Sequence, residues 1–419
     1  MLTILAAVVH LVAKAADMKV LSFAIYPLIR PVHGGQLRSA ALNRSLVRAG
    51  WTVKHCCIFV AGLFDEVAED DWGFPVHLAP DTRADVDCCD ALLADEHKLD
   101  ALLVSMRDFA PDVLMLHQPW TWPAVKAVVP KLATKPKVIY SSQNCEAILM
   151  QDLLKGYSIE QRERLLQKTT KIENALVEAC DALICVSAAD RDAFSPSKPN
   201  IVLRNGVEPS NRRFRTGDLI DAQLDDNKFA LFIGSGHPPN GEGFNELVAP
   251  DFGFLQSNHS IVVAGNVCHL LRKQSWFQAA DPADLSRLTL LDFVPDDVLA
   301  ELIMHCTAII LPLVSGGGTN LKTAEALYSR KSVIATRFAF RGFETYMNMP
   351  HVHFADTRHE FKTALRRALD QDTRYCFSSY DNKRLDQLTW PLVLSPLADF
   401  LSKLVKPRPT LFQGITGLG

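Results

Sequence analysis

The sequence predicts an α/β protein with two domains, each built on a mainly parallel sheet that helices cover on both faces. The chain has 419 residues, more than the ~100–200 that one hydrophobic core usually supports. Short apolar runs alternate with amphipathic stretches almost throughout, as is typical of parallel strands joined by helices. A polar, aperiodic segment at 205–227 separates two such series, so we expect the hinge between domains there.

The first series contains short runs of apolar residues that we interpret as buried strands. They are Val20–Tyr26, Thr52–Phe59, Val113–His117, Val138–Ser142, Ala182–Val186 and Ile201–Leu203. Helices are expected at Gln36–Ala49, Asp87–Phe109 and Glu160–Ala179. In the last of these, apolar residues recur at helical spacing with arginine and lysine between them.

The second series repeats the pattern. Its expected strands are Phe229–Ile233, Ile261–Ala264, Leu288–Leu291, Ala308–Leu311 and Ser332–Thr336. Trp390–Val405 is expected to be a helix long enough to cross back to the first domain. The predicted divisions are therefore a first domain at 18–207, a linker at 208–227, a second domain at 228–389, the crossing helix at 390–405 and a loose tail at 406–419.

The first thirteen residues are almost wholly apolar. A membrane span needs roughly 20 such residues, and a signal peptide begins with basic residues, so neither pattern is met. Met18 stands directly before the first expected strand. We therefore expect residues 1–17 to lie upstream of the natural start, with a weak signal sequence as the alternative.

Composition excludes several classes of function. The 44 basic and 47 acidic side chains give a net charge of -3, which argues against a surface that neutralises nucleic-acid phosphates. The ten cysteines include no Cys-x-x-Cys pair, so we expect reduced, mostly buried thiols rather than a zinc or redox motif. No carboxylate cluster has metal-ligand spacing, and neither a metal nor a cofactor is expected.

A glycine-rich loop follows the strand expected at Ala308–Leu311. A helix is expected to begin near Thr319, so backbone amides and the positive end of the helix dipole would meet at one place. This arrangement predicts a phosphate-binding loop formed by Ser315, Gly316, Gly317, Gly318, Thr319 and Asn320.

Two charged residues of the same helix extend this prediction. Lys322 and Glu325 are three residues apart and should lie beside each other near the mouth of the site. Lys322 would neutralise a bound diphosphate, and Glu325 would accept both hydroxyls of a ribose. The alternative is an ordinary glycine turn followed by an exposed ion pair worth a few tenths of a kcal/mol.

Loops at other strand ends supply further candidates, because ligands of open α/β sheets bind beyond the carboxyl ends of the strands. In the first domain these loops carry Gly34, Gly35, His117, Gln118, Asn144 and Glu146, and in the second Ser235, His237, Asn240 and Gly265. The two sets would face each other across a cleft. Tight-turn glycines and structural histidines are the competing interpretations.

Several motifs in order resemble those of glycosyltransferase family 4, a group of retaining enzymes with the GT-B fold that use nucleotide-sugar donors. The similarity covers residues 18 to about 400. The motifs are His33-Gly34-Gly35, His117, Ser142-Gln143-Asn144-Cys145-Glu146, Val186-Ser187, Arg204-Asn205-Gly206-Val207-Glu208, and Gly316-Gly317-Gly318 with Lys322 and Glu325.

The resemblance implies two Rossmann-like domains facing across a cleft, with the nucleotide sugar in the second domain and the acceptor in the first. Glu325 matches the ribose-binding glutamate, His117 a histidine near the donor sugar, and Gly34-Gly35 the loop beside the diphosphate. Lys322, Glu325 and His117 are thus the expected catalytic residues. The expected acceptor contacts are Gln118, Asn144 and Glu146.

The sequence departs from the family pattern at three positions. Position 317 is glycine where the family often has the first of two glutamates. Ser235 and Asn240 stand where the family has an arginine and a lysine. In this version of the motif, Lys322 is expected to be the main remaining cation.

The resemblance implies transfer of a sugar, of hexosyl type and with retention, from a nucleotide-diphosphate sugar to a glycan or lipid-linked hydroxyl, as in polysaccharide biosynthesis. The expected location is the cytoplasm or the inner face of the membrane, which the basic face of Glu160–Ala179 would contact unless that face is simply solvated. The alternatives are a nucleotide-sugar 2-epimerase-like isomerase and a catalytically decayed binding scaffold.

Overall fold

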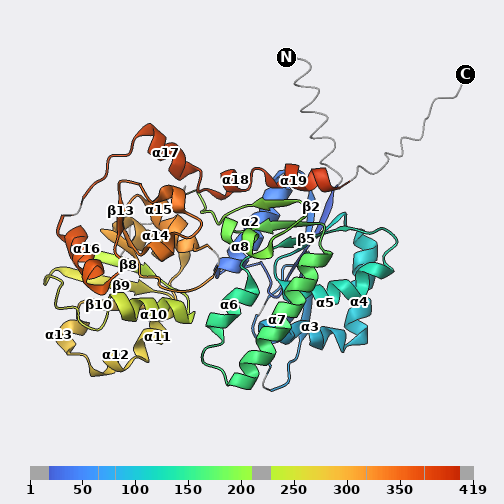
Figure 1. The fold of residues 1–419 in the computed structure, drawn as a ribbon, viewed down its shortest axis with the longest axis horizontal. Coiled ribbons are helices and arrows are strands. Elements are labelled where there is room, and N and C mark those ends of the chain that lie inside the picture. The colour runs from blue at the N-terminus through green and yellow to red at the C-terminus, as the bar shows by residue number, and fades with distance from the viewer. Residues whose placement is uncertain are drawn as a thin grey trace, which may run out of the picture.

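The computed structural model describes residues 18–64, 66–80, 82–209, 228–317, 319–371 and 373–405. It confirms the α/β class, with one seven-stranded and one six-stranded parallel sheet (Figure 1). The expected extension at 1–17, nearly all of the linker at 208–227, Gly318 and the tail at 406–419 lie outside the described residues.

The first sheet contains every strand expected in that half of the chain. Its order is β3 (Trp72–Val76), β2 (Thr52–Val60), β1 (Lys19–Ala24), β4 (Val113–Leu116), β5 (Lys137–Ser141), β6 (Ala182–Cys185), β7 (Asn200–Val202). Only β3 was not predicted. It contains Gly73 and Pro75, which weaken a strand pattern but are tolerated at a sheet edge, where β3 lies.

The second sheet likewise contains all its expected strands. Its order is β10 (Leu288–Leu291), β9 (His259–Ala264), β8 (Lys228–Ile233), β11 (Ala308–Leu311), β12 (Ser332–Ala335), β13 (Val352–Phe354). The additional edge strand β13 has only three residues and is partly exposed, so it lacks the long apolar run that marks the central strands.

Helices cover both sheets. In the first half these are α2 (Gly34–Arg48), α3 (Ala84–Leu93), α4 (Glu96–Phe109), α5 (Trp122–Val128), α6 (Glu146–Leu153), α7 (Ile159–Ala179) and α8 (Ala188–Phe194). The prediction of one helix at Asp87–Phe109 was wrong. Asp95 interrupts it, because its side chain accepts a hydrogen bond from the amide of Lys98 and so begins α4 as a separate helix.

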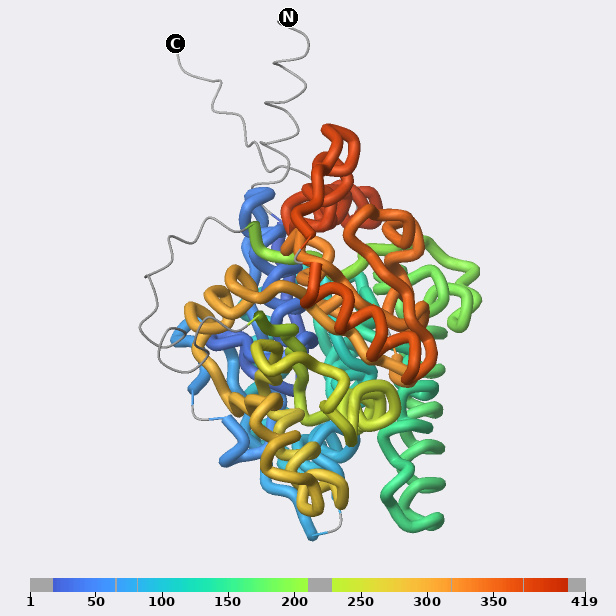
Figure 2. The backbone as a smooth tube through the Cα atoms, turned by 90° about the vertical axis from the view of Figure 1, so that its left-hand side faces the viewer, coloured from blue at the N-terminus to red at the C-terminus, as the bar shows by residue number. Residues whose placement is uncertain are grey.

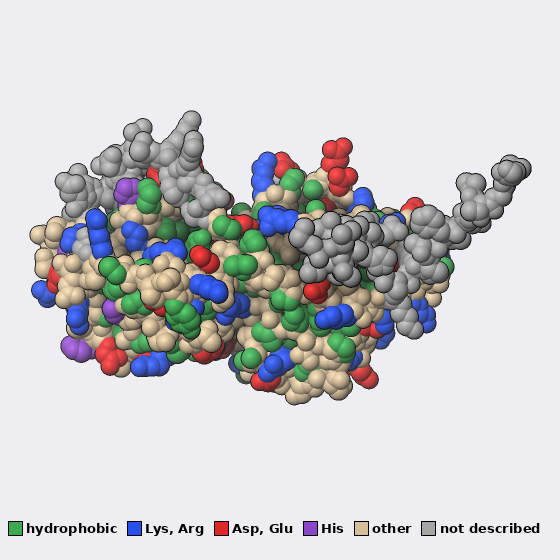
Figure 3. All heavy atoms as spheres, turned by 90° about the horizontal axis from the view of Figure 1, so that it is seen from above, with side chains coloured by type: hydrophobic (Ala, Val, Ile, Leu, Met, Phe, Trp, Pro, Cys, Tyr) green, Lys and Arg blue, Asp and Glu red, His purple; other side chains and the backbone are tan. Residues whose placement is uncertain are grey.

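The second sheet is covered by α10 (Pro238–Leu247), α11 (Val267–Arg272), α12 (Ser275–Ala279), α13 (Pro282–Leu285), α14 (Asp296–His305), α15 (Leu321–Ser329), α16 (Arg358–Gln371) and α17 (Ser379–Asp386). Figure 2 looks from this second half of the molecule toward the first. From above, the surface is indented between two lobes (Figure 3).

The segment after α17 returns to the first sheet. It forms two short helices, α18 (Trp390–Val393) and α19 (Leu397–Leu404), rather than the single helix predicted. Pro396 separates them, since the residue before a proline is disfavoured in the helical conformation. Both helices pack against α2, and Leu397 and Leu401 belong to the same buried cluster as Val20 of β1.

The described parts of the chain contain no helix long and apolar enough to span a bilayer. On α7, two of the basic side chains that were expected to form a basic face are paired with acidic residues of the protein itself. Arg164 and Lys168 form ion pairs with Asp87 of α3, and Lys168 also pairs with Asp90. The ten cysteines are free thiols, and all but Cys145 and Cys376 are buried, so the predicted burial of most of them is confirmed.

Candidate active site between the two sheets

The glycine-rich loop leads from β11 into α15. Gly316 has φ +119°, a backbone conformation that favours glycine. The helix begins at Leu321 rather than near Thr319 as predicted, because Asn320 still has extended backbone angles. Asn320 makes no side-chain capping bond, and the first turn contains no acidic residue. The amino end of α15 therefore offers amides and positive dipole potential to an anion.

This helix end faces the first half of the molecule. A Cβ atom built on Gly34, the first residue of α2, would lie 3.1 Å from Cδ1 of Leu321. One built on Gly317 would lie 3.2 Å from Cδ1 of Leu149 and 3.6 Å from Oδ1 of Asn144. The loops after β1 and β5 thus oppose the glycine-rich loop, so predicted site residues from both halves meet.

Lys322 begins a short chain of hydrogen bonds that runs through Asn240 to Ser235. Its Nζ donates to Oδ1 of Asn240 at 2.5 Å, and the Nδ2 of Asn240 donates to the carbonyl and hydroxyl oxygens of Ser235 at 2.8 and 3.2 Å. The ammonium also lies 5.6 Å from the centre of the Phe232 ring. Asn240, itself bonded to Ser235, therefore holds Lys322 in place.

Lys322 and Glu325 also affect each other's charge. Burial lowers the pKa of Lys322 to about 8, and the neighbouring carboxylate opposes that shift. Burial raises the pKa of Glu325 to about 7, again opposed by its neighbour. The ammonium directs its hydrogen bond to Asn240 and not to Glu325, so the pair is coupled through charge.

Two histidines stand at helix starts on opposite sides of the cleft. His33 caps α2 by accepting from the amide of Gln36 at 3.3 Å. Burial, with the charge of His237 adding to it, lowers the pKa of His33 to about 4. His237 precedes α10 at the exposed rim of the cleft. Desolvation by the surrounding protein lowers the pKa of His237, and the positive charge of Lys322 lowers it further. Both shifts favour the neutral imidazole.

Gly35 is closely packed below the cleft, against the side chains of Gln143 and Tyr26. A Cβ there would lie 2.4 Å from Oε1 of Gln143 and 2.6 Å from the hydroxyl of Tyr26. That hydroxyl accepts hydrogen bonds from the amide groups of Gln143 and Gln118. Gln118 is buried, and its Oε1 accepts from the amide of Ile25 at 3.2 Å, so both ends of this expected acceptor contact are used within the protein.

His117 follows β4 and is fully buried. Its Nε2 lies 3.0 Å from the hydroxyl of Ser22, which lies 3.1 Å from Nδ1 of His55. Burial lowers the pKa of His117 well below its ordinary value. Its Nδ1 has no hydrogen-bond partner in the described part of the chain, and its catalytic role stays a prediction.

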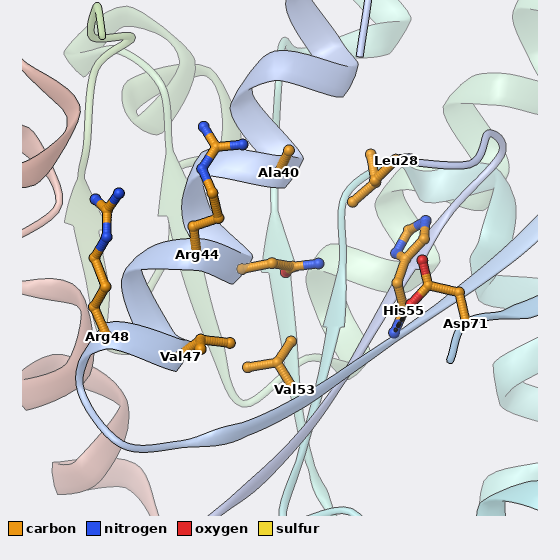
Figure 4. Close-up of a pocket in the computed structure, with 9 residues that line it drawn as sticks. Leu28, Ala40, Arg44, Val47, Arg48, Val53, His55 and Asp71 are labelled. Carbon is orange, nitrogen blue, oxygen red and sulfur yellow. Dashed lines mark hydrogen bonds between the residues drawn. The ribbon is translucent and has the colours of Figure 1, made fainter. Parts of the chain in front are cut away.

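His55 also lines a cavity of about 420 Å³ beside α2 and β2 (Figure 4). Arg44 and Arg48 of α2, together with Asp71, supply its charged lining. None of the predicted site residues lines this cavity.

Asn144 and Glu146 lie at the start of α6. The Nδ2 of Asn144 donates to Glu146 at 3.2 Å, and burial, with Glu173 adding to it, raises the pKa of Glu146 to about 8. Glu173 of α7 accepts from the amides of Glu146 and Ala147, both at 2.9 Å, and from the hydroxyl of Tyr140 at 2.7 Å. Sequence reasoning missed Glu173, which lies within an otherwise amphipathic helix.

Two further donor candidates have clear local roles. Gly265 has φ +100°, and a Cβ there would lie 2.4 Å from the carbonyl oxygen of Gly234, so it is a tight-turn glycine. The hydroxyl of Ser315 donates to Glu242 at 3.3 Å. Among the described residues, no group of three or more His, Cys, Asp or Glu side chains has the arrangement of a metal site.

Comparison with known proteins gives no match to any family model. It also gives no match among curated protein sequences. Solved structures do match over almost the whole chain. Sucrose-phosphate synthase from Thermosynechococcus elongatus is 14% identical, with 92% of this chain and 99% of that chain covered and a TM-score of 0.70.

Two further structures show the same likeness. HepE from Anabaena in complex with UDP and glucose is 12% identical, covers 92% of this chain and 100% of its own, and has a TM-score of 0.60. WaaG, a glycosyltransferase involved in lipopolysaccharide biosynthesis, is 12% identical, covers 92% and 99%, and has a TM-score of 0.59. At these identities the likeness shows the fold, which is the GT-B arrangement of two Rossmann-like domains.

Proposed function

We propose that this chain is a glycosyltransferase that moves a sugar from a nucleotide-diphosphate sugar to an acceptor hydroxyl. One observation carries the proposal. The uncapped amino end of α15 and the ammonium of Lys322, held by Asn240, lie together opposite Gly34 of the first domain. A helix end with an adjacent lysine is a recurrent way to bind phosphate. The similarity in fold to a protein whose structure was solved with UDP and glucose supports the proposal that this chain binds a nucleotide sugar.

The two domains divide the substrates in this proposal. The second domain, 228–389, binds the donor through the glycine-rich loop, with Lys322 at the diphosphate and Glu325 at the ribose. The first domain, 18–207, binds the acceptor near Asn144, whose side chain lies beside Gly317. His117 acts close to the donor sugar. The linker at 208–227 and the helical segment at 390–405 join the two halves.

The mechanism follows from where charge develops. As the bond between sugar and diphosphate lengthens, negative charge collects on the leaving oxygen, and the α15 amides and Lys322 stabilise it. Preorganised donors are effective here because they need not reorganise during the reaction. The acceptor attacks from the face that the diphosphate leaves, and its hydroxyl proton passes to the departing phosphate oxygen, which gives retention without a dedicated protein base. We assign no cofactor, since the helix end and Lys322 supply the positive potential.

The finer assignments rest on sequence motifs. We propose membership of glycosyltransferase family 4, hexosyl transfer, and a glycan or lipid-linked acceptor in polysaccharide biosynthesis. We further propose a cytoplasmic location, with peripheral contact at the inner face of the membrane. No nucleic-acid partner is proposed, because the net charge of -3 offers no general attraction to phosphates.

Nucleotide binding tests the proposal first. Thermal unfolding is measured with a panel of nucleoside diphosphates, with the matching monophosphates as controls. A ligand that binds only the folded state stabilises it by about 2.7 kcal/mol at a hundred times its Kd. We expect at least one diphosphate to raise the Tm and its monophosphate to raise it less. The absence of a shift with any diphosphate would contradict the proposal.

Turnover separates the remaining alternatives. The corresponding nucleotide sugars are incubated with and without candidate acceptors, and the products are identified. Transfer to an acceptor, or slow hydrolysis of the donor, supports a glycosyltransferase. An epimerised nucleotide sugar formed without acceptor would indicate the isomerase instead. Tight binding without turnover under any condition would indicate a decayed scaffold.

A further inference from the structure

Arg38 of α2 is a charged side chain enclosed within the fold. It is 1% exposed and is among the largest side chains that are fully buried. Its Nη1 donates to Oδ1 of Asn205 at 3.3 Å, while Nε and Nη2 have no hydrogen-bond partner in the described residues. Burying a charged group with donors left over is costly. A buried arginine with unsatisfied donors therefore indicates a specific role for the Arg38 side chain.

Asn205 connects Arg38 to the glycine-rich loop through hydrogen bonds. It lies just after β7 and is buried, and its Nδ2 donates to the carbonyl oxygen of Thr319 at 2.8 Å. Because an asparagine side chain both accepts and donates, it satisfies Arg38 with one end and Thr319 with the other. Arg38 and Asn205 belong to the first half of the chain, and Thr319 to the second.

Thr319 is also held from its side-chain end. Gly342 has φ +76°, and a Cβ built on it would lie 2.2 Å from Cγ2 of Thr319, so a larger residue at position 342 would displace this threonine. Thr319 is two residues before Leu321, the first residue of α15. Fixing its carbonyl therefore fixes the direction in which the helix start approaches the first domain.

We propose that Arg38 is a positioning residue that acts through Asn205 on the Thr319 carbonyl and thereby holds the start of α15 in the geometry that receives the diphosphate. This inference rests on the proposed function. It adds a connection between the two domains. The hydrogen bonds that Asn205 forms with Arg38 and Thr319 would both hold the cleft closed and order the glycine-rich loop that binds the donor.

Replacement of Asn205 by aspartate breaks one link and keeps the other. The carboxylate still accepts from Arg38, but it has no proton to donate to the Thr319 carbonyl. We expect the Kd of the nucleoside diphosphate that stabilises the wild type to rise about three- to tenfold, as for loss of one hydrogen bond. The donor KM should rise by the same factor, with kcat changed less.

Arg38→Met removes the other end of the chain and should weaken nucleotide binding in the same direction. The double variant should be no weaker than the more affected single variant, because both changes interrupt one path. Arg44→Met is the matched control. Arg44 is an exposed arginine on the same helix, paired with Glu208, and its loss should leave the Kd unchanged.

The outcomes distinguish this inference from the proposed function. If the wild type binds nucleoside diphosphates and Asn205→Asp binds them equally well, the positioning role is wrong and the proposed function stands. Additive losses in the double variant would likewise overturn the positioning role. If the wild type binds no nucleoside diphosphate, the proposed function fails and this inference fails with it. Should Arg38→Met not fold, Asn205→Asp alone decides, since it keeps the size of the side chain.

Discussion

Lys322→Met removes the cation from the proposed diphosphate site while keeping most of the aliphatic stem beside Phe232. In the structure, Lys322 is half-buried, and its ammonium is fixed by a 2.5 Å hydrogen bond to Asn240. Loss of one preorganised donor at a developing negative charge typically costs about 2.7–4 kcal/mol. We therefore expect kcat to fall about a hundred- to a thousandfold.

The assay measures release of nucleoside diphosphate from the donor at saturating acceptor, with Tm recorded to show that the variant is folded. Asn240→Ala is the matched control, because it removes the hydrogen-bond partner and leaves the ammonium. We expect this control to lose about tenfold or less, as for one hydrogen bond. Wild-type turnover by Lys322→Met would refute the reasoning, and so would an equal loss in both variants, which would mean that the lysine only orients Asn240.

Three further predictions concern the same site and its frame. For the donor, kcat/KM should be maximal between pH 7 and 8. Glu325, with its pKa raised to about 7, loses its charge below that range, and Lys322, with its pKa lowered to about 8, loses its charge above it. A flat profile of kcat/KM from about pH 6 to 9 would contradict this. Glu325→Gln should raise the donor KM about tenfold, since an amide oxygen accepts more weakly than a carboxylate, and an unchanged KM would exclude a ribose contact. Gly243→Ala should lower the free energy of unfolding, measured in urea, by about 1–3 kcal/mol, because the new Cβ would lie 1.8 Å from the carbonyl oxygen of Pro312. Gly156→Ala is the control and should be nearly neutral, because there is open space around that position. Equal stability of the two variants would show that the backbone moves to accommodate the Cβ at position 243.

The central strands could be predicted from sequence because burial on both faces leaves an unbroken apolar run. Ile310 of β11 and Ile261 of β9 are examples of such fully buried positions. The edge strands β3 and β13 could not be predicted in this way, since their exposed positions dilute the pattern. The break between α3 and α4 depends on one capping residue, Asp95, within a stretch that otherwise reads as helical.

The candidate site was predictable as a set of loops but not as a set of contacts. The strand-end rule brought Lys322, Asn240 and Gly34 to the same cleft. Their pairing was not predicted, because Lys322 and Asn240 are 82 residues apart and meet only because β8 and β11 pair as neighbouring parallel strands. Arg38 was missed for the same reason: its hydrogen-bond partner, Asn205, lies 167 residues away in the sequence.

The buried carboxylate Glu173 illustrates the remaining difficulty. In sequence it sits among the charged residues of α7, where a solvated position is the usual expectation. In the structure it accepts from the amides that begin α6, and its environment exists only after two helices and β5 have packed. A helix start that lacks its own side-chain cap, as at Cys145, is the one local signal that a distant acceptor is needed.

The central claim concerns where the diphosphate of the donor binds. A crystal structure with the nucleoside diphosphate that raises the Tm most tests it directly. We predict that the terminal phosphate lies at the amino end of α15, within hydrogen-bonding distance of backbone amides there and of Nζ of Lys322. A phosphate bound elsewhere, such as in the cavity beside Arg44 and Arg48, with the start of α15 left without an anion, would contradict the account.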